Sequence, residues 1–190
     1  MANTNSPFGF KPVGKVGQNA DNQGLSQYNI ADNSSTSIFQ GDLVKMTSTG
    51  YIDQSGASDP SLGVFWGAFI SKDPSTGKPK YTNVYTQTNV ATGQTIEAFV
   101  YDDPYARFEV QADDGAIAQA DVGFNFDINV GTGSTINGQS AMTLDVGTSA
   151  ATALLLRVIG FSKDPDNSIG AYAKTIVTIN EHQLKSTTGV

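Results

Sequence analysis

The residues of this chain that could perform chemistry are few and dispersed. His182 is the only histidine among 190 residues, and cysteine is absent. A Ser-His-Asp or Cys-His arrangement needs a histidine or a cysteine nucleophile, and a zinc site takes several His or Cys ligands. Since His182 stands in the polar stretch Asn180 to Gln183, we interpret it as an ordinary surface or interface side chain.

Acidic residues occur in pairs beside proline or glycine: Asp102-Asp103, Asp113-Asp114 and Asp164-Pro165-Asp166. Two carboxylates could support glycoside hydrolysis, and a loop of Asp and Asn oxygens could hold calcium. Aspartate is also favoured in turns because its side chain caps the backbone. The spacing does not match an EF-hand, so structural turns are the favoured interpretation, with calcium and catalysis as alternatives.

Two further motifs are weak. The loop Gly131-Thr132-Gly133-Ser134 lacks the Lys and Ser/Thr that follow in a phosphate-binding P-loop, so it indicates a flexible connection. Trp66 could stack on a sugar or a base, but its apolar neighbours favour a place in the core. A glycan-binding role would require Trp66 to be exposed. We predict no catalytic residue, no metal ligand and no cofactor, and a protein that is not an enzyme.

Composition and charge exclude several partners. Charged residues make up 15% of the chain and hydrophobic residues 38%, both below the averages of about 25% and 45–50%. With 20 glycines, the chain favours turns and short strands over long helices. A net charge of -7 argues against contact with nucleic acid or an anionic membrane. Since no apolar run reaches the length of a signal peptide or a membrane span, we expect a soluble protein without an obvious export signal.

Short apolar or alternating segments separated by turn signals predict about ten strands. They are 38–39, 43–46, 51–52, 62–70, 81–85, 96–101, 107–111, 124–128, 154–161 and 174–180. No segment has a helical period over three turns. The predicted fold is mainly β, a compact β-barrel or β-sandwich of short antiparallel strands with little helix. Its predicted core contains Val64, Phe65, Trp66, Phe69, Phe108, Val110, Phe124, Phe126, Ile128, Leu156 and Val158.

The ends of the chain differ from its centre. Residues 1–27 have no apolar period and are rich in Gly and Pro, which predicts an extended N-terminal arm before a β domain over 28–185. Residues 186–190 form a polar C-terminal tail. A disordered terminus is the alternative for the arm, but a purely solvated tail has no need of Phe8 and Phe10. We therefore assign Phe8, Phe10 and Pro12 to partner binding.

Several segments together resemble head decoration (cement) proteins of tailed bacteriophages. They are MANTNSPFGFKPV, GDLVKMTSTGYI, SLGVFWGAF, DDPYARFEVQAD, ADVGFNFDI and DPDNSIGAYAKTIVTINEH. The likeness extends along nearly the whole chain, although its motifs are structural and none is diagnostic alone.

The resemblance implies a virion structural protein on the outer surface of the capsid. It would bind the major capsid protein, cross-link neighbouring subunits and act as a homo-oligomer, with a trimer favoured over a dimer. Two alternatives stay open: another virion β module, associated with a tail or fibre, and a surface carbohydrate-binding or hydrolytic domain. Fold-level likeness does not decide between them.

Overall fold

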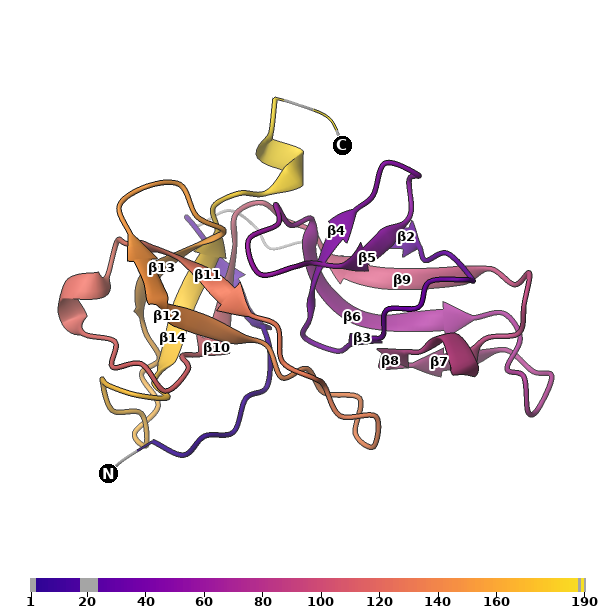
Figure 1. Ribbon diagram of the computed structural model, residues 1–190, viewed down its shortest axis with the longest axis horizontal. Helices are drawn as coiled ribbons and strands as arrows, with labels where there is room; N and C mark the ends of the chain where they lie inside the picture. Colours follow the sequence, from indigo (N-terminus) through magenta and orange to yellow (C-terminus); the bar gives the residue numbers. More distant parts are fainter. Residues whose placement is uncertain (1–2, 18–23, 188, 190) are drawn as a thin grey trace.

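The computed structural model describes residues 3–17, 24–187 and 189. As predicted, the protein is mainly β with antiparallel sheets, and its described helices are three single 3₁₀ turns. They are η1 (Gln87–Asn89), η2 (Gln119–Asp121) and η3 (Gln183–Lys185). The strands form two lobes that lie side by side (Figure 1).

Lobe 1 is a six-stranded antiparallel sheet in the order β1-β10-β14-β13-β11-β12. Its strands are β1 (Lys11–Lys15), β10 (Ala106–Gln111), β14 (Lys174–Ile179), β13 (Leu156–Phe161), β11 (Asn125–Asn129) and β12 (Thr143–Ala150). Its inner face encloses a first hydrophobic core, here core 1, to which β10, β11 and β13 contribute Phe108, Phe126 and Leu156. One bridge between Ala112 and Leu144 brings β12 back beside the end of β10, so the sheet curls around core 1 without becoming a continuous barrel.

Lobe 2 has a second sheet in the order β2-β9-β6-β4-β5, with β7 on β6, and a two-stranded ribbon of β3 and β8. Its strands are β2 (Ser26–Asn29), β3 (Ile38–Phe39), β4 (Leu43–Met46), β5 (Ile52–Gln54), β6 (Gly63–Ile70), β7 (Lys80–Thr82), β8 (Val84–Tyr85) and β9 (Ile96–Tyr101). Ile38 and Tyr85 of the ribbon are fully buried with the sheet in a second cluster, core 2. Of the two lobes, lobe 2 therefore corresponds better to the predicted β-sandwich.

Strands β4 and β6 join the lobes because they supply both cores. Leu43 pairs with Val64, and both side chains lie in core 1. The next residues, Val44 and Phe65, lie in core 2. Adjacent side chains of a strand point to opposite faces, so this strand pair is a shared wall between the two lobes.

A bulge in β6 changes which side chains face core 2. Phe65 pairs with Val100 and Gly67 pairs with Phe99, which leaves Trp66 as an extra residue. Ala68 and Ile70 therefore continue the buried face that Phe65 begins, while Trp66 is 38% exposed.

The prediction of Trp66 and Phe69 as core residues is thus wrong. Trp66 alternates with Phe65, and the extra residue shifts Phe69, so both side chains lie on the side of the sheet opposite core 2. Phe69 is half-buried there, beside β7.

Phe124 is also outside the core. Its strand begins at Asn125, one residue later than the alternation suggested, and Phe124 lies in the turn after η2, where its N–H bonds to Asp121 O at 3.0 Å. It is 41% exposed. The other predicted core residues are buried: Val64, Phe65, Phe108, Val110, Phe126, Ile128, Leu156 and Val158.

The predicted N-terminal arm is part of the folded body wherever it is described. Strand β1 pairs with β10, and Phe10, 1% exposed, contacts Phe108 edge-on at 6.5 Å in core 1. Strand β2 already belongs to lobe 2. The assignment of residues 1–27 as a separate arm is corrected because Phe10 fills a place in the chain's own core. Residues 1–2 and 18–23 of that arm, and 188 and 190 of the C-terminal tail, lie outside the described residues.

We expect Phe126→Ala to lower the free energy of unfolding by about 3–5 kcal/mol, because the fully buried ring leaves a cavity in core 1. The matched control is Phe124→Ala, two residues away and 41% exposed, which should cost under about 1 kcal/mol. Chemical denaturation measures both. Equal losses would show that the inward face of β11 is misassigned.

Candidate partner-binding groove

Two side-chain amides fasten the start of the described chain to lobe 1. Asn3 Nδ2 donates to Ser168 O at 2.7 Å, and Asn3 Oδ1 accepts from Ser168 N at 2.9 Å. Gln111, which is 3% exposed, accepts from Ser6 N at 2.9 Å and donates to Thr4 O at 2.9 Å. The segment before β1 forms no strand. Hydrogen bonds from the side chains of Asn3 and Gln111 hold it where backbone hydrogen bonds between strands would otherwise do so.

The segment then crosses the Gly41-Asp42 turn at very close range. Phe10 N donates to Gly41 O at 2.8 Å. Gly9 has φ +70°, and a Cβ there would lie 2.6 Å from Gly41 O, so only glycine fits. This crossing sends Phe10 into core 1 and leaves Phe8 half-buried at the surface.

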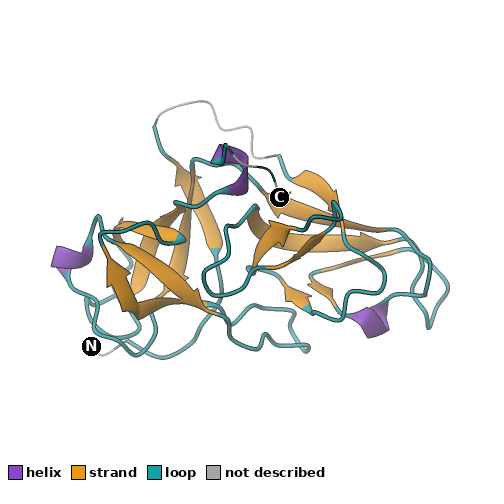
Figure 2. Cartoon of the chain, turned by 45° about the horizontal axis from the view of Figure 1, so that its top comes forward, coloured by secondary structure: helices purple, strands orange, loops and turns teal. Residues whose placement is uncertain are grey.

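Beside this crossing a groove of about 970 Å³ opens between the lobes. In Figure 2 the chain from the N-terminus runs along lobe 1 toward this region. The groove is lined by the N-terminal segment, by β10 and the start of β14, by the loop before β14, and by parts of lobe 2. The lining side chains used below are Phe8, Trp66, Glu109, Gln111, Asn137, Gln139, Asp164 and Lys174.

Trp66 is the principal aromatic surface of the groove. Its side chain lies on the face of β6 opposite Phe65, where the ring packs edge-on against Tyr101 with centroids 5.4 Å apart. A smaller cavity of about 290 Å³, next to β1, is also lined by Trp66 and by Lys11. Trp66 therefore lies where two hollows meet.

Three of the charged side chains at the lobe 1 end of the groove have partners within the chain. Lys174 Nζ lies 2.5 Å from Asp164 Oδ2, and this contact lowers the pKa of Asp164 and raises that of Lys174. Glu109 accepts a hydrogen bond from Ser162 Oγ at 2.7 Å. What the groove offers is an aromatic ring, the exposed amides of Asn137 and Gln139, and charges of both signs, a combination suited to binding an extended polar chain.

The residues predicted for partner binding are separated by the structure. Phe8 lines the groove, Pro12 lines the smaller cavity, and Phe10 is in core 1. Sequence reasoning missed Trp66 and Gln111 as lining residues. For Trp66 a signal existed, since a glycine inside a strand, here Gly67, often marks a bulge. For Gln111 no sequence signal existed.

His182 is buried, contrary to the surface position interpreted from its polar neighbours. It is 2% exposed, and its Nδ1 accepts from Leu184 N at 3.1 Å. The segment around it attaches to lobe 2, because Ser61 N and O bond to Glu181 O and Gln183 N. Burial, and then the charge of Lys185, lowers the pKa of His182 to about 4, so the imidazole is neutral near pH 7.

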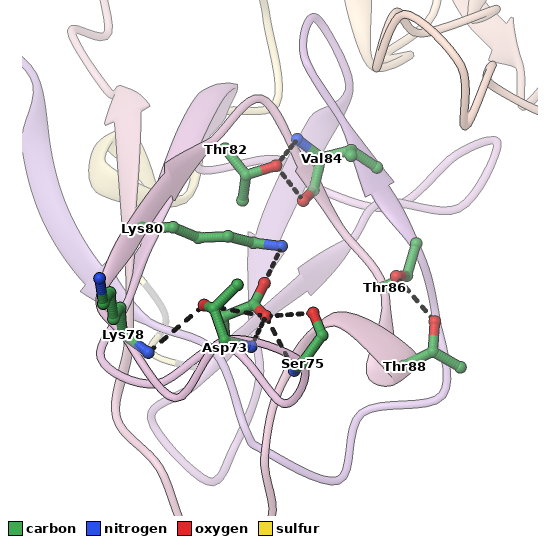
Figure 3. A network of polar contacts seen from close by, with 9 residues as sticks. Asp73, Ser75, Lys78, Lys80, Thr82, Val84, Thr86 and Thr88 are labelled. Atoms are coloured by element: carbon green, nitrogen blue, oxygen red, sulfur yellow. Dashed lines mark hydrogen bonds and ion pairs between the residues drawn. The ribbon is translucent and has the colours of Figure 1, made fainter.

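The carboxylates of the acidic turns bond to their own surroundings. Asp102 accepts from Tyr28 OH at 2.7 Å, and Asp103 forms an ion pair with Lys15. Asp73, in the loop before β7, accepts from Ser75 N at 2.9 Å and pairs with Lys80 at 2.5 Å (Figure 3). Bonds from Lys80 and Ser75 lower the pKa of Asp73.

Among the described residues, no three His, Cys, Asp or Glu side chains are placed to hold a metal ion. In the same ranges no helix is long and apolar enough to cross a membrane.

Comparisons with known proteins found no match among protein-family models, curated proteins or solved structures.

The buried imidazole predicts a pH dependence of stability. Above pH 6.5 His182 is neutral whether the chain is folded or unfolded. Between pH 6.5 and about 4 only the unfolded chain takes up the proton, so stability falls with falling pH, by up to about 3 kcal/mol. His182→Asn keeps an acceptor for Leu184 N and removes the titrating group. Denaturation across this window should show a steeper loss for the wild type than for the variant, and parallel profiles would contradict a buried neutral His182.

Proposed function

We propose that this protein is a capsid decoration protein of a tailed bacteriophage. It binds the outer surface of the head and links neighbouring major capsid protein subunits. The resemblance of its segments to such proteins supports this assignment. The physical observation that carries it is an unusually aromatic outer face on lobe 2.

This outer aromatic face consists of Trp66, Phe69, Tyr81, Phe99 and Tyr101, on the side of the sheet opposite core 2. Tyr81 is 76% exposed and packs between Phe69, at 4.9 Å, and Phe99, at 6.1 Å. Neighbouring aromatic rings on a soluble protein's surface are typical of protein interfaces, where they bury much area at little entropic cost. In a chain with few charged residues, this face is the strongest candidate for a contact with the shell.

The groove supplies a second contact for an extended segment of a capsid subunit. Trp66 belongs both to the outer aromatic face and to the groove, so the two surfaces are continuous. Binding to several subunits at once can raise avidity by about 10²–10⁴. A homo-oligomer, with a trimer favoured over a dimer, would multiply these contacts further.

Attachment to heads tests the proposal. Tyr81→Ala should lower occupancy on purified heads that lack the protein by at least tenfold, because Tyr81 is the most exposed ring of the face. The control is Tyr51→Ala, a tyrosine 42% exposed at the β4–β5 turn, which should attach as the wild type does. Co-sedimentation measures occupancy. Absence of wild-type binding, or copy numbers typical of a tail part, would sink the decoration assignment.

A second candidate function, binding of a surface carbohydrate, is favoured by one observation. Trp66 is exposed in a groove whose other lining groups include the exposed amide side chains of Asn137 and Gln139. Stacking of a sugar ring on an aromatic side chain, with amides on its hydroxyls, is a common mode of recognition.

Trp66 is the only tryptophan, so its fluorescence reports directly on the groove. If the groove binds carbohydrate, titration with neutral oligosaccharides should shift the Trp66 emission saturably. Trp66→Ala should abolish binding on a glycan array, while Tyr51→Ala should preserve it. A null array together with an unmoved spectrum would exclude this candidate and leave the decoration proposal untouched.

A further inference from the structure

The only two arginines of the chain lie in one row across lobe 1. Arg157 on β13 pairs with Thr178 on β14 and with Asn125 on β11. Phe108 pairs with Val177, so the preceding residue, Arg107 on β10, also falls beside Thr178. The two arginines are thus separated by two strand spacings, about 10 Å, within reach of one ligand.

Both arginines point away from core 1. Their strand neighbours Phe108, Leu156 and Val158 are fully buried in that core, and side chains alternate along a strand. At one end of the row Gly14 of β1 pairs with Arg107, and a Cβ at Gly14 would meet nothing within 4 Å. The row therefore borders open space.

Neither guanidinium group has a carboxylate partner in the described part of the chain. Arg107 Nε is buried from solvent and has no hydrogen-bond acceptor among the described residues. Arg157 Nε donates to Asn125 Oδ1 at 2.9 Å. The ion pairs found in the described ranges all join a lysine to an aspartate, and neither arginine takes part. An unpaired charged donor is costly, and although this Nε is shielded from solvent, a carboxylate from outside that contacts the rest of the guanidinium group would compensate its charge.

A third cation adjoins the row. Lys185 Nζ lies 4.9 Å from the centre of the Tyr105 ring and donates to Ile179 O at 3.4 Å. Burial lowers the pKa of Lys185; Asp103 opposes this shift and the charge of Arg157 adds to it. At this edge of lobe 1 the cations Lys15, Arg107, Arg157 and Lys185 outnumber the carboxylates of Asp102 and Asp103, in a chain whose net charge is -7.

We propose that Arg107 and Arg157 form a binding site for a carboxylate of a partner protein. A guanidinium donates two parallel hydrogen bonds to a carboxylate, the geometry that arginine fits best. A polyanion such as nucleic acid would be repelled by the acidic remainder of the surface, whereas a Glu or Asp side chain presents its charge locally. The site lies on lobe 1 and does not rest on the proposed function.

The test uses the isolated full-length protein and a blocked hexaglutamate peptide as probe. Because the chain has two arginines, its nitrogen–proton NMR spectrum contains two Arg Nε signals, which Arg107→Lys and Arg157→Lys assign. We expect hexaglutamate to shift both signals saturably and a blocked hexaglutamine peptide to leave them in place. Unmoved signals would overturn the proposal without bearing on attachment to heads.

Variants separate a specific site from bulk charge. Arg107→Gln should weaken hexaglutamate binding at least tenfold, and Arg107→Lys, which keeps the charge but loses the planar fork, should weaken it less. The control Lys72→Gln removes one exposed positive charge from lobe 2 and should change binding less than twofold. If Lys72→Gln weakened binding equally, the peptide would be responding to the overall charge of the protein and not to the two arginines. Tighter binding of inorganic phosphate than of hexaglutamate would show that the ligand class is wrong.

Discussion

The arrangement of the whole molecule depends on the pairing of β4 with β6 at the boundary of the two lobes. Leu43 and Val64 face core 1 while Val44 and Phe65 face core 2, so neither core is complete without this pair. Two lobes that share a wall cannot slide or hinge freely, because any relative motion would open one core. The groove between the lobes and the outer aromatic face beside it therefore have a fixed geometry.

The turn before β4 extends this constraint to the N-terminus. Gly41 N donates to Phe65 O and Phe65 N donates to Asp42 O, both at 2.8 Å, and Gly41 O accepts from Phe10 N. Asp42 is fully buried, and its Oδ2 accepts from Phe39 N and from Gln54 Nε2, both at 2.8 Å. Burial raises the pKa of Asp42 against these bonds. The hydrogen bonds of the Asp42 carboxylate order the backbone on which the N-terminal segment docks, and this ordering offsets the cost of burying the carboxylate.

The sequence predicted the mainly β fold and most strands because period-two alternation is a local signal. It predicted the buried faces of β10 and of β13 up to Val158, after which the pairing of β13 becomes irregular. It failed in β6, where one extra residue at Trp66 moves Phe69 away from core 2. It also missed β1 as a strand, since Pro12 and Gly14 break the pattern and only the free edge of β10 completes it. Long-range acceptors such as Gln111 and the burial of His182 depend on which loops meet, which no local pattern encodes.

The scarcity of charge in this chain makes the position of each charge informative. The ion pairs in the described ranges are partly exposed lysine–aspartate contacts that fix turns, and such pairs add little to stability. The two cores must therefore supply most of the folding free energy, and the surface is left for contact through shape and aromatic area. Against that neutral background, Arg107, whose buried Nε has no acceptor among the described residues, costs stability. Binding of a negatively charged group on another molecule would compensate this cost. That is a physical reason for both arginines of the chain to lie in one row.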